Sequence, residues 1–99
     1  MNRRDVVFAP EARADVLALY EWISAKAGPE TALAYIGRIE RYLNGFDLAS
    51  ERGRARDDIR TGLRVIGFER RVTIAFTVSD QTVTILRLFY GGQNWEEDV

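Results

Sequence analysis

The sequence contains neither cysteine nor histidine. Without cysteine, the chain can form no disulfide, thiolate metal site or thiol nucleophile. Without histidine, it also lacks the usual general base and the commonest metal ligand, which excludes catalytic triads and histidine metal sites. Any chemistry rests on carboxylate, tyrosine, lysine or arginine groups, and we expect no metal and no cofactor.

Long apolar runs and an excess of basic charge are missing as well. No segment approaches the ~18 apolar residues that span a bilayer, and the first residues lack the apolar core of a signal peptide. The 14 basic and 15 acidic residues give a formal net charge of −1, whereas proteins that grip nucleic acid through its phosphates are usually basic overall. These absences favour a cytoplasmic protein, without a membrane segment, that acts on a protein target.

The 99 residues suffice for one domain, and the first half has a helical apolar period. A short apolar segment from Asp5 to Phe8 predicts a first strand. Apolar residues spaced by three and four predict a helix that begins at Pro10 and ends at Gly28. A second helix begins at Pro29, and we expect it to continue to about Ala49.

The second half changes to a period of two. A polar, charged loop from Ser50 to Thr61 precedes three predicted strands, which run from Leu63 to Phe68, Arg71 to Val78 and Thr82 to Tyr90. The order strand, helix, helix and three strands predicts an α+β domain. We expect a helix hairpin on one face of a sheet that ends in a three-stranded meander, with the other face partly open.

The segment from Val83 to Tyr90 is the most apolar in the chain, and Arg87 lies at its centre. Strict alternation would place Val83 and Ile85 on one face of this strand and Leu88 on the other. An unpaired guanidinium in such a place costs several kcal/mol. Arg87 therefore either pairs with a carboxylate or opens into a wet concave surface.

Arg64 and Arg87 have two interpretations. Their guanidinium groups suit a phosphate or carboxylate ligand, and a shared basic surface would arise if the sheet order made their strands neighbours. The interpretation that we favour is a structural ion pair with Asp57, Asp58 or Glu69.

Two aromatic residues near the end of the chain are also ambiguous. Tyr90 would serve as a general acid or base if a neighbouring arginine lowered its pKa from about 10, but a tyrosine at a strand end usually packs. Trp95 lies in the acidic tail from Gln93 to Val99. It either anchors a partner or folds back onto the sheet.

Four large residues of the predicted helices, Leu17, Trp22, Tyr35 and Tyr42, fall outside the main apolar stripes. Each either widens the core contact or belongs to an exposed surface that binds a partner.

The whole pattern resembles the ParE toxins of the RelE/ParE superfamily, the toxic halves of bacterial type II toxin–antitoxin pairs. The matching segments are VFAPEARADVLALYEWI, ALAYIGRIERYL, the GLR that begins at Gly62, and VTILRLFYGG, and together they cover nearly the full chain. The resemblance implies a RelE-like fold, in which two helices pack on a small, mainly antiparallel sheet. The family's usual ending places a His-Gly pair after the last strand, and this chain has Tyr90 and Gly91 there.

The resemblance also implies a ParD-like antitoxin that neutralises the toxin. The antitoxin binds operator DNA, so the toxin would meet that DNA only through its partner. The four residues outside the apolar stripes are then candidates for antitoxin contact. The candidates for target contact are Arg64, Arg87, Tyr90 and Trp95.

The superfamily divides by target. ParE-like members resemble poisons of DNA gyrase, and RelE-like members resemble ribosome-dependent mRNA endonucleases. The acidic balance, the single lysine and the missing histidine favour a gyrase-directed toxin that acts by binding rather than as an enzyme. An mRNA interferase that uses Arg64, Arg87 and Tyr90 is the alternative, and a non-toxic antitoxin-binding module is a third possibility. We expect Arg87 mainly to organise its sheet face and Trp95 to contact the target.

Overall fold

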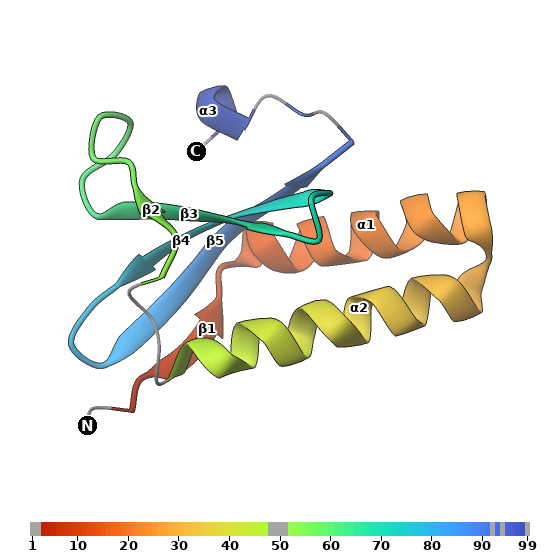
Figure 1. Cartoon of the computed structure of the whole chain (residues 1–99), viewed down its shortest axis with the longest axis horizontal. Helices are drawn as coiled ribbons and strands as arrows, with labels where there is room; N and C mark the ends of the chain where they lie inside the picture. Colours follow the sequence, from red (N-terminus) through yellow and green to blue (C-terminus); the bar gives the residue numbers. More distant parts are fainter. Residues whose placement is uncertain (1–2, 48–51, 92, 94, 99) are drawn as a thin grey trace.

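The computed structural model describes residues 3–47, 52–91, 93 and 95–98, and it has the expected α+β architecture (Figure 1). Two long helices form a hairpin that covers one face of a five-stranded sheet. The elements are β1 (Asp5–Phe8), α1 (Pro10–Ala27), α2 (Pro29–Asn44), the 3-10 turn η1 (Gly45–Asp47), β2 (Arg54–Ala55), β3 (Leu63–Phe68), β4 (Val72–Val78), β5 (Thr82–Tyr90) and α3 (Trp95–Asp98).

A single residue, Gly28, connects α1 to α2. Its φ of 96° lies in the left-handed region that favours glycine, and its N–H donates to the carbonyl of Ser24 at 2.9 Å. Pro29 then begins α2. The predicted boundary is confirmed. The helix α2 ends at Asn44, earlier than expected, and the predicted end at Ala49 lies outside the described residues.

The strand order in the sheet is β1-β5-β4-β3-β2. The predicted meander of β3, β4 and β5 is confirmed, and β1 runs parallel to β5 while the other neighbours are antiparallel. The two-residue strand β2 pairs with β3 inside the segment that we expected to be a loop. A strand of only two residues is too short to show an alternating pattern, so the sequence pattern did not reveal it.

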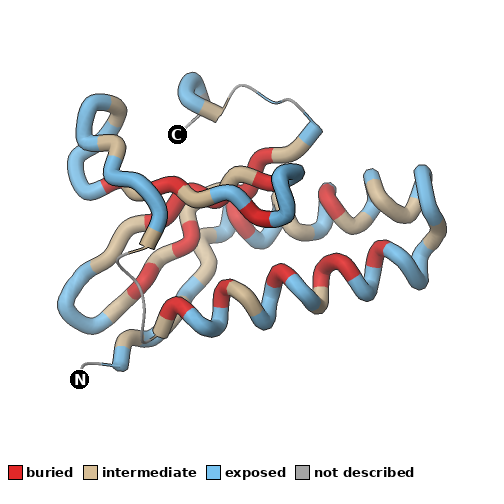
Figure 2. Tube along the Cα trace, viewed as in Figure 1, coloured by how far each residue is buried: buried red, intermediate tan, exposed pale blue. Residues whose placement is uncertain are grey.

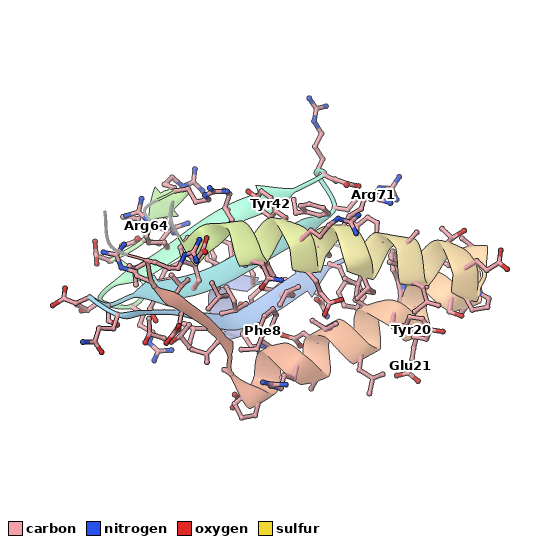
Figure 3. All side chains as sticks on the ribbon, turned by 90° about the horizontal axis from the view of Figure 1, so that it is seen from below. Phe8, Tyr20, Glu21, Tyr42, Arg64 and Arg71 are labelled. Atoms are coloured by element: carbon pink, nitrogen blue, oxygen red, sulfur yellow. The ribbon has the colours of Figure 1, made fainter. Side chains whose placement is uncertain are left out.

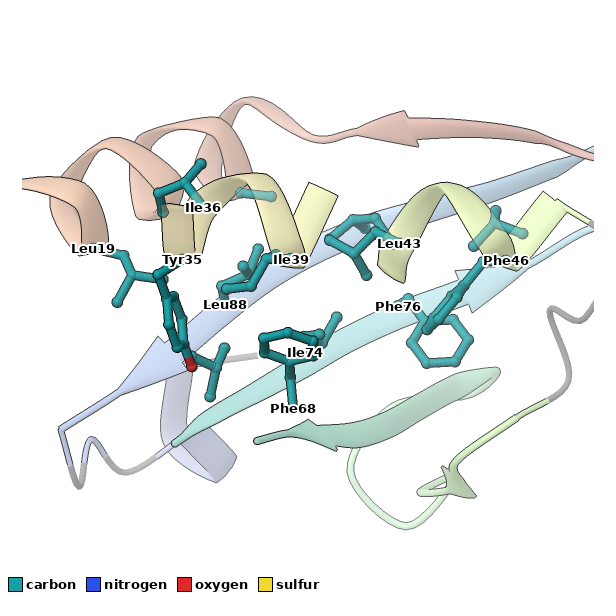
Figure 4. Close-up of a cluster of buried hydrophobic side chains, with 14 residues drawn as sticks. Leu19, Tyr35, Ile36, Ile39, Leu43, Phe46, Phe68, Ile74, Phe76 and Leu88 are labelled. Atoms are coloured by element: carbon teal, nitrogen blue, oxygen red, sulfur yellow. The ribbon is translucent and has the colours of Figure 1, made fainter. Parts of the chain in front are cut away.

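The main core lies between the helix hairpin and the sheet, where buried residues line the inner side of both helices (Figure 2). Leu19 of α1 and Ile39 of α2 meet Ile74 and Leu88 of the central strands (Figure 4). Among the described residues, no helix is both long and apolar enough to cross a membrane.

An irregularity in β5 overturns the predicted division of its faces. The pairing with β4 passes from Ala75 opposite Arg87 to Phe76 opposite Ile85, so Leu86 is an extra residue, as in a β-bulge. The extra residue reverses the alternation beyond it. Leu88 therefore joins Val83 and Ile85 in the main core, although strict alternation placed it on the opposite face.

The second face of the sheet carries a smaller core. Leu63, Val65, Ala75 and Phe89 are buried there, and Trp95 of α3 packs against them. The acidic tail thus contains a short helix that covers part of this face. This cluster covers part of the second face, which was expected to be partly open.

Candidate functional site

Arg87 is held by Asp15 of α1. Its Nε donates to Asp15 Oδ2 at 2.7 Å and its second terminal nitrogen donates to Oδ1 at 3.1 Å. The Leu88 N–H also donates to Oδ2, at 2.9 Å. Because β1 ends at Phe8, paired with Ile85, the next residues of β5 are not covered by a strand on that side. The Asp15 carboxylate accepts the hydrogen bond that a neighbouring strand would otherwise accept from this part of the β5 edge.

The structural ion pair expected for Arg87 is observed, but the predicted partners were wrong. The carboxylate comes from α1, 72 residues away, and not from Asp57, Asp58 or Glu69. The side chains of Asp15 and Arg87 are 15% and 28% exposed. A bidentate pair that is this enclosed positions α1 against the sheet edge.

Arg64 donates to two backbone carbonyls. Its Nε donates to the carbonyl of Arg52 at 3.0 Å, and a terminal nitrogen donates to that of Gly53 at 3.4 Å. The strand β4 separates β3 from β5, so Arg64 and Arg87 are not on neighbouring strands. Arg64 pairs with Phe76 of the main core, and Arg87 pairs with a residue of the smaller core. The predicted shared basic surface is therefore not formed.

A groove lies where the tip of the helix hairpin approaches the β3–β4 turn and the end of β5. It has a volume of about 630 Å³. Leu19, Ile23 and Val72 contribute apolar surface, and Trp22 and Tyr90 meet there with ring centroids 5.2 Å apart. We call this feature the hairpin groove.

The rim of the hairpin groove is mainly basic. Lys26, Arg38, Arg70 and Arg71 contribute positive charge, and Glu69 contributes the negative charge. Figure 3 shows Arg71 beside α2, far along the molecule from Arg64. In a chain of net charge −1, this concentration of cations stands apart from the overall balance and suits an acidic ligand.

Arg38 and Glu69 join α2 to the β3–β4 turn. Arg38 Nε donates to Glu69 Oε2 at 2.9 Å and a terminal nitrogen donates to Oε1 at 3.0 Å. This donation holds the pKa of the Glu69 carboxyl below its usual range. The turn has φ of 50° at Glu69 and 60° at Arg70, a left-handed conformation that residues other than glycine, asparagine and aspartate adopt at a cost.

Tyr35 lies at the floor of the hairpin groove, and only 8% of it is exposed. Its ring points from α2 towards the sheet (Figure 4) and meets Phe68 edge-on at a centroid distance of 5.8 Å. Burial raises the pKa of its hydroxyl, and the Glu69 carboxylate adds to the effect. The group therefore stays protonated and remains a hydrogen-bond donor at neutral pH.

Comparison with known families identifies the chain. The model described as the ParE toxin of the type II toxin–antitoxin system parDE matches residues 6–95. The chain belongs to the ParE toxin family.

Solved structures agree with this family in fold. The chromosomal ParDE toxin–antitoxin system from P. aeruginosa matches at a TM-score of 0.78 and 25% identity, covering 89% of this ParE chain and 96% of that chain. The RelBE2 toxin–antitoxin complex from Mycobacterium tuberculosis matches at a TM-score of 0.56 and 18% identity, covering 94% of this chain and 97% of that chain. The second likeness concerns the fold alone. A search of curated protein sequences returns no significant match.

The predicted residues of this ParE chain fall in different places. Trp22, Tyr35 and Tyr90 come together in the hairpin groove. Leu17 lies outside it and is 61% exposed. Tyr42 is half-buried between aromatic core residues, which leaves little of it for a partner.

The premise that Tyr35 lies off the core is wrong. It follows Ala32 by three residues and precedes Ile39 by four, a spacing that puts it on the buried face of α2. The same spacing in the sequence was a signal of burial. Its role in binding antitoxin remains a prediction.

Trp95 is folded back in this ParE chain, half-buried against the smaller core. The Arg56 guanidinium lies 5.1 Å from its ring centroid and pairs with Glu96 at 3.2 Å. Arg56 also makes a bidentate pair with Asp58, at 2.9 Å for both contacts. The basic loop thus secures the acidic tail by direct contacts. Of the two interpretations of Trp95, packing on the sheet is the one observed.

Sequence reasoning missed the basic rim of the groove in this ParE chain. Lys26 lies on α1, Arg38 on α2 and Arg71 in the β3–β4 turn, and no local sequence pattern joins them. One signal was present: the tight turn between two clear strands has Glu69 and Arg70 where glycine, asparagine or aspartate is usual. Groups of three or more acidic, histidine or cysteine residues suited to a metal ion are absent from the residues that the structure describes.

Proposed function

We propose that this ParE-family chain inhibits growth by binding and poisoning DNA gyrase, and that a ParD-like antitoxin neutralises it. The observation that carries the proposal is the family match over residues 6–95. The likeness to the ParDE system from P. aeruginosa supports the same pairing of toxin and antitoxin. The chain acts in the cytoplasm, where gyrase works, and reaches operator DNA only through its antitoxin.

Inhibition by binding, without catalysis by this chain, is the mechanism that the arrangement of residues favours. The three residues that an mRNA interferase would use are separated. Arg87 pairs with Asp15, Arg64 donates to backbone carbonyls, and Tyr90 packs against Trp22. A general acid or base must reach the same reacting group as its electrostatic partners, and these three side chains lie on different parts of the sheet.

The target surface is proposed to include Trp95 and the tail around it. Trp95 presents a large ring next to charged groups, which is typical of an interface anchor. The variant Trp95→Phe retains an aromatic ring over the smaller core but loses the indole N–H and part of the ring. It should weaken toxicity while the chain remains folded by circular dichroism.

Inducible expression tests the function. Expression of the chain should stop growth and relax a reporter plasmid, because inhibited gyrase no longer supercoils it. Co-expression of the product of the neighbouring antitoxin gene should restore both. Growth arrest with normal plasmid supercoiling and cleaved mRNA would support the interferase instead, and normal growth would support a non-toxic antitoxin-binding module.

A further inference from the structure

The hairpin groove contains a hydrogen-bond donor that its own protein does not use. The Tyr35 hydroxyl is inaccessible to solvent, and among the described residues it has no hydrogen-bond partner. A buried hydroxyl without a partner is rare because its desolvation is not compensated. Contact with Phe68 fixes the ring, so the hydroxyl cannot turn freely towards water.

The charges around this hydroxyl point to an anionic acceptor. Glu69, Arg71 and Arg38 are the charged groups that act on it. Arg38 already forms an ion pair with Glu69, whereas Arg70 and Arg71 form no ion pair within the described part of the chain. A carboxylate placed here would accept a hydrogen bond from Tyr35 and pair with Arg71.

The cover over Tyr35 can open. Arg38 lies over the Tyr35 ring, 5.0 Å from its centroid, and is joined to Glu69 by a pair whose side chains are 44% and 39% exposed. An ion pair this exposed contributes little to stability. The strained backbone of the turn at Glu69 and Arg70 further lowers the cost of moving it.

The apolar part of the groove sets the second requirement. Leu19, Ile23 and Val72 line it, and the Trp22 ring is 37% exposed beside them. A volume of about 630 Å³ is enough for more than one large apolar side chain. The occupant must therefore carry an acidic and an apolar side chain close together, as an amphipathic peptide segment does.

We propose that the hairpin groove anchors an acidic, amphipathic segment of the antitoxin, with one carboxylate bound to the Tyr35 hydroxyl and Arg71 and an adjacent apolar side chain against Trp22. This assignment rests on the proposed neutralisation by a ParD-like antitoxin. On binding, the incoming carboxylate displaces the Arg38–Glu69 pair, in which Arg38 lies over the Tyr35 ring. Tyr35 and Arg71 are then the residues that select an acidic anchor.

The variant Tyr35→Phe tests the anchor in two ways. In the free chain it should leave the melting temperature unchanged or raise it, because the hydroxyl that is removed has no partner. In the complex with the purified antitoxin, measured by calorimetry, it should weaken binding about tenfold, since a hydrogen bond to a charged group is lost. Tyr20→Phe, on α1 and outside the groove, is the matched control and should change neither quantity.

Charge variants test the carboxylate. Arg71→Gln should weaken antitoxin binding about tenfold or more, whereas Arg41→Gln, an exposed arginine of α2 outside the groove, should have no effect. Glu69→Gln should bind at least as tightly as the wild type, because the competing carboxylate is gone. A structural role for Glu69 would instead weaken binding.

The outcomes separate the anchor from the function. If the wild-type chain binds the antitoxin and neither Tyr35→Phe nor Arg71→Gln changes the affinity, the proposed anchor is overturned while the toxin–antitoxin pairing stands. A lower melting temperature of free Tyr35→Phe would also overturn it, since the hydroxyl would then have an internal role. Absence of any complex with the antitoxin would contradict the proposed pairing and the anchor together.

Discussion

Replacing Asp15 by alanine should strongly destabilise the chain. The change leaves the Arg87 guanidinium without its carboxylate and the Leu88 N–H without its acceptor. Breaking a fully buried ion pair costs about 3–5 kcal/mol, and water compensates part of this because Arg87 is 28% exposed. A backbone N–H without a partner costs about 1–3 kcal/mol. We expect a total loss of about 3 kcal/mol.

The assay is unfolding in urea and by heat, followed by circular dichroism. A loss of about 3 kcal/mol in a domain of this size lowers the melting temperature by roughly 12 to 24 °C. Asp15→Asn should cost less, about 1–2 kcal/mol, because the amide oxygen still accepts from Leu88. The control is Glu21→Ala, an exposed carboxylate on the same helix (Figure 3), which should change stability by less than about 0.5 kcal/mol. Equal melting temperatures for Asp15→Ala and Glu21→Ala would refute the reasoning.

The same pair decides what Arg87 does in the toxin. If Arg87 mainly positions α1 on the sheet edge, Arg87→Ala and Asp15→Ala should lose toxicity in proportion to their loss of folded protein. Their effects on stability should also be strongly non-additive, because each removes the same contact. An Arg87→Ala variant that folds and binds antitoxin normally but is not toxic would show that Arg87 contacts the target.

Two further predictions concern the tail and the helix connection. The Arg56 guanidinium holds the pKa of the Asp58 carboxyl below its usual 3.8. The stability that this pair contributes is therefore present above pH 3.8 and is lost as the pH falls through the lowered pKa. In a Trp22→Phe background, the fluorescence of Trp95 should shift to the red as the pH falls through that lowered pKa, and an unchanged spectrum down to about pH 2 would contradict the role of this pair. Gly28→Ala should lower the free energy of unfolding, measured in urea, by about 1–3 kcal/mol. The cause is the φ of 96° at this residue, because an added Cβ would meet no atom within 4 Å. An unchanged free energy of unfolding would contradict this account of the helix connection.

The sequence predicted the elements well where the pattern was periodic. Apolar spacing and the Gly28–Pro29 pair located the helix hairpin, and alternation located β3, β4 and β5. The predicted assignment of β5 residues to its two faces was wrong because Leu86 is a bulge residue. A bulge leaves the apolar composition of a strand unchanged, so the sequence does not show it. The predicted partner of Arg87 was wrong for another reason. Asp15 lies 72 residues away in the sequence, and nothing in the local pattern distinguishes it from other polar residues of its helix.

The candidate site was predicted only in part. Trp22, Tyr35 and Tyr90 were singled out separately, but their assembly into one groove depends on how the hairpin tip meets the β3–β4 turn. The basic rim depends on the same packing. Trp95 was correctly seen as either an anchor or a packed residue, and its contact with Arg56 required the position of the loop relative to the tail.

The central claim is that this ParE-family chain is a gyrase poison under antitoxin control. The most direct measurement incubates the purified chain with DNA gyrase and supercoiled plasmid, and quantifies cleaved DNA after denaturation of the enzyme. We expect linear DNA to accumulate with increasing toxin and to disappear when the antitoxin is added first. Unchanged gyrase activity, together with mRNA cleavage on ribosomes by the same preparation, would contradict the account.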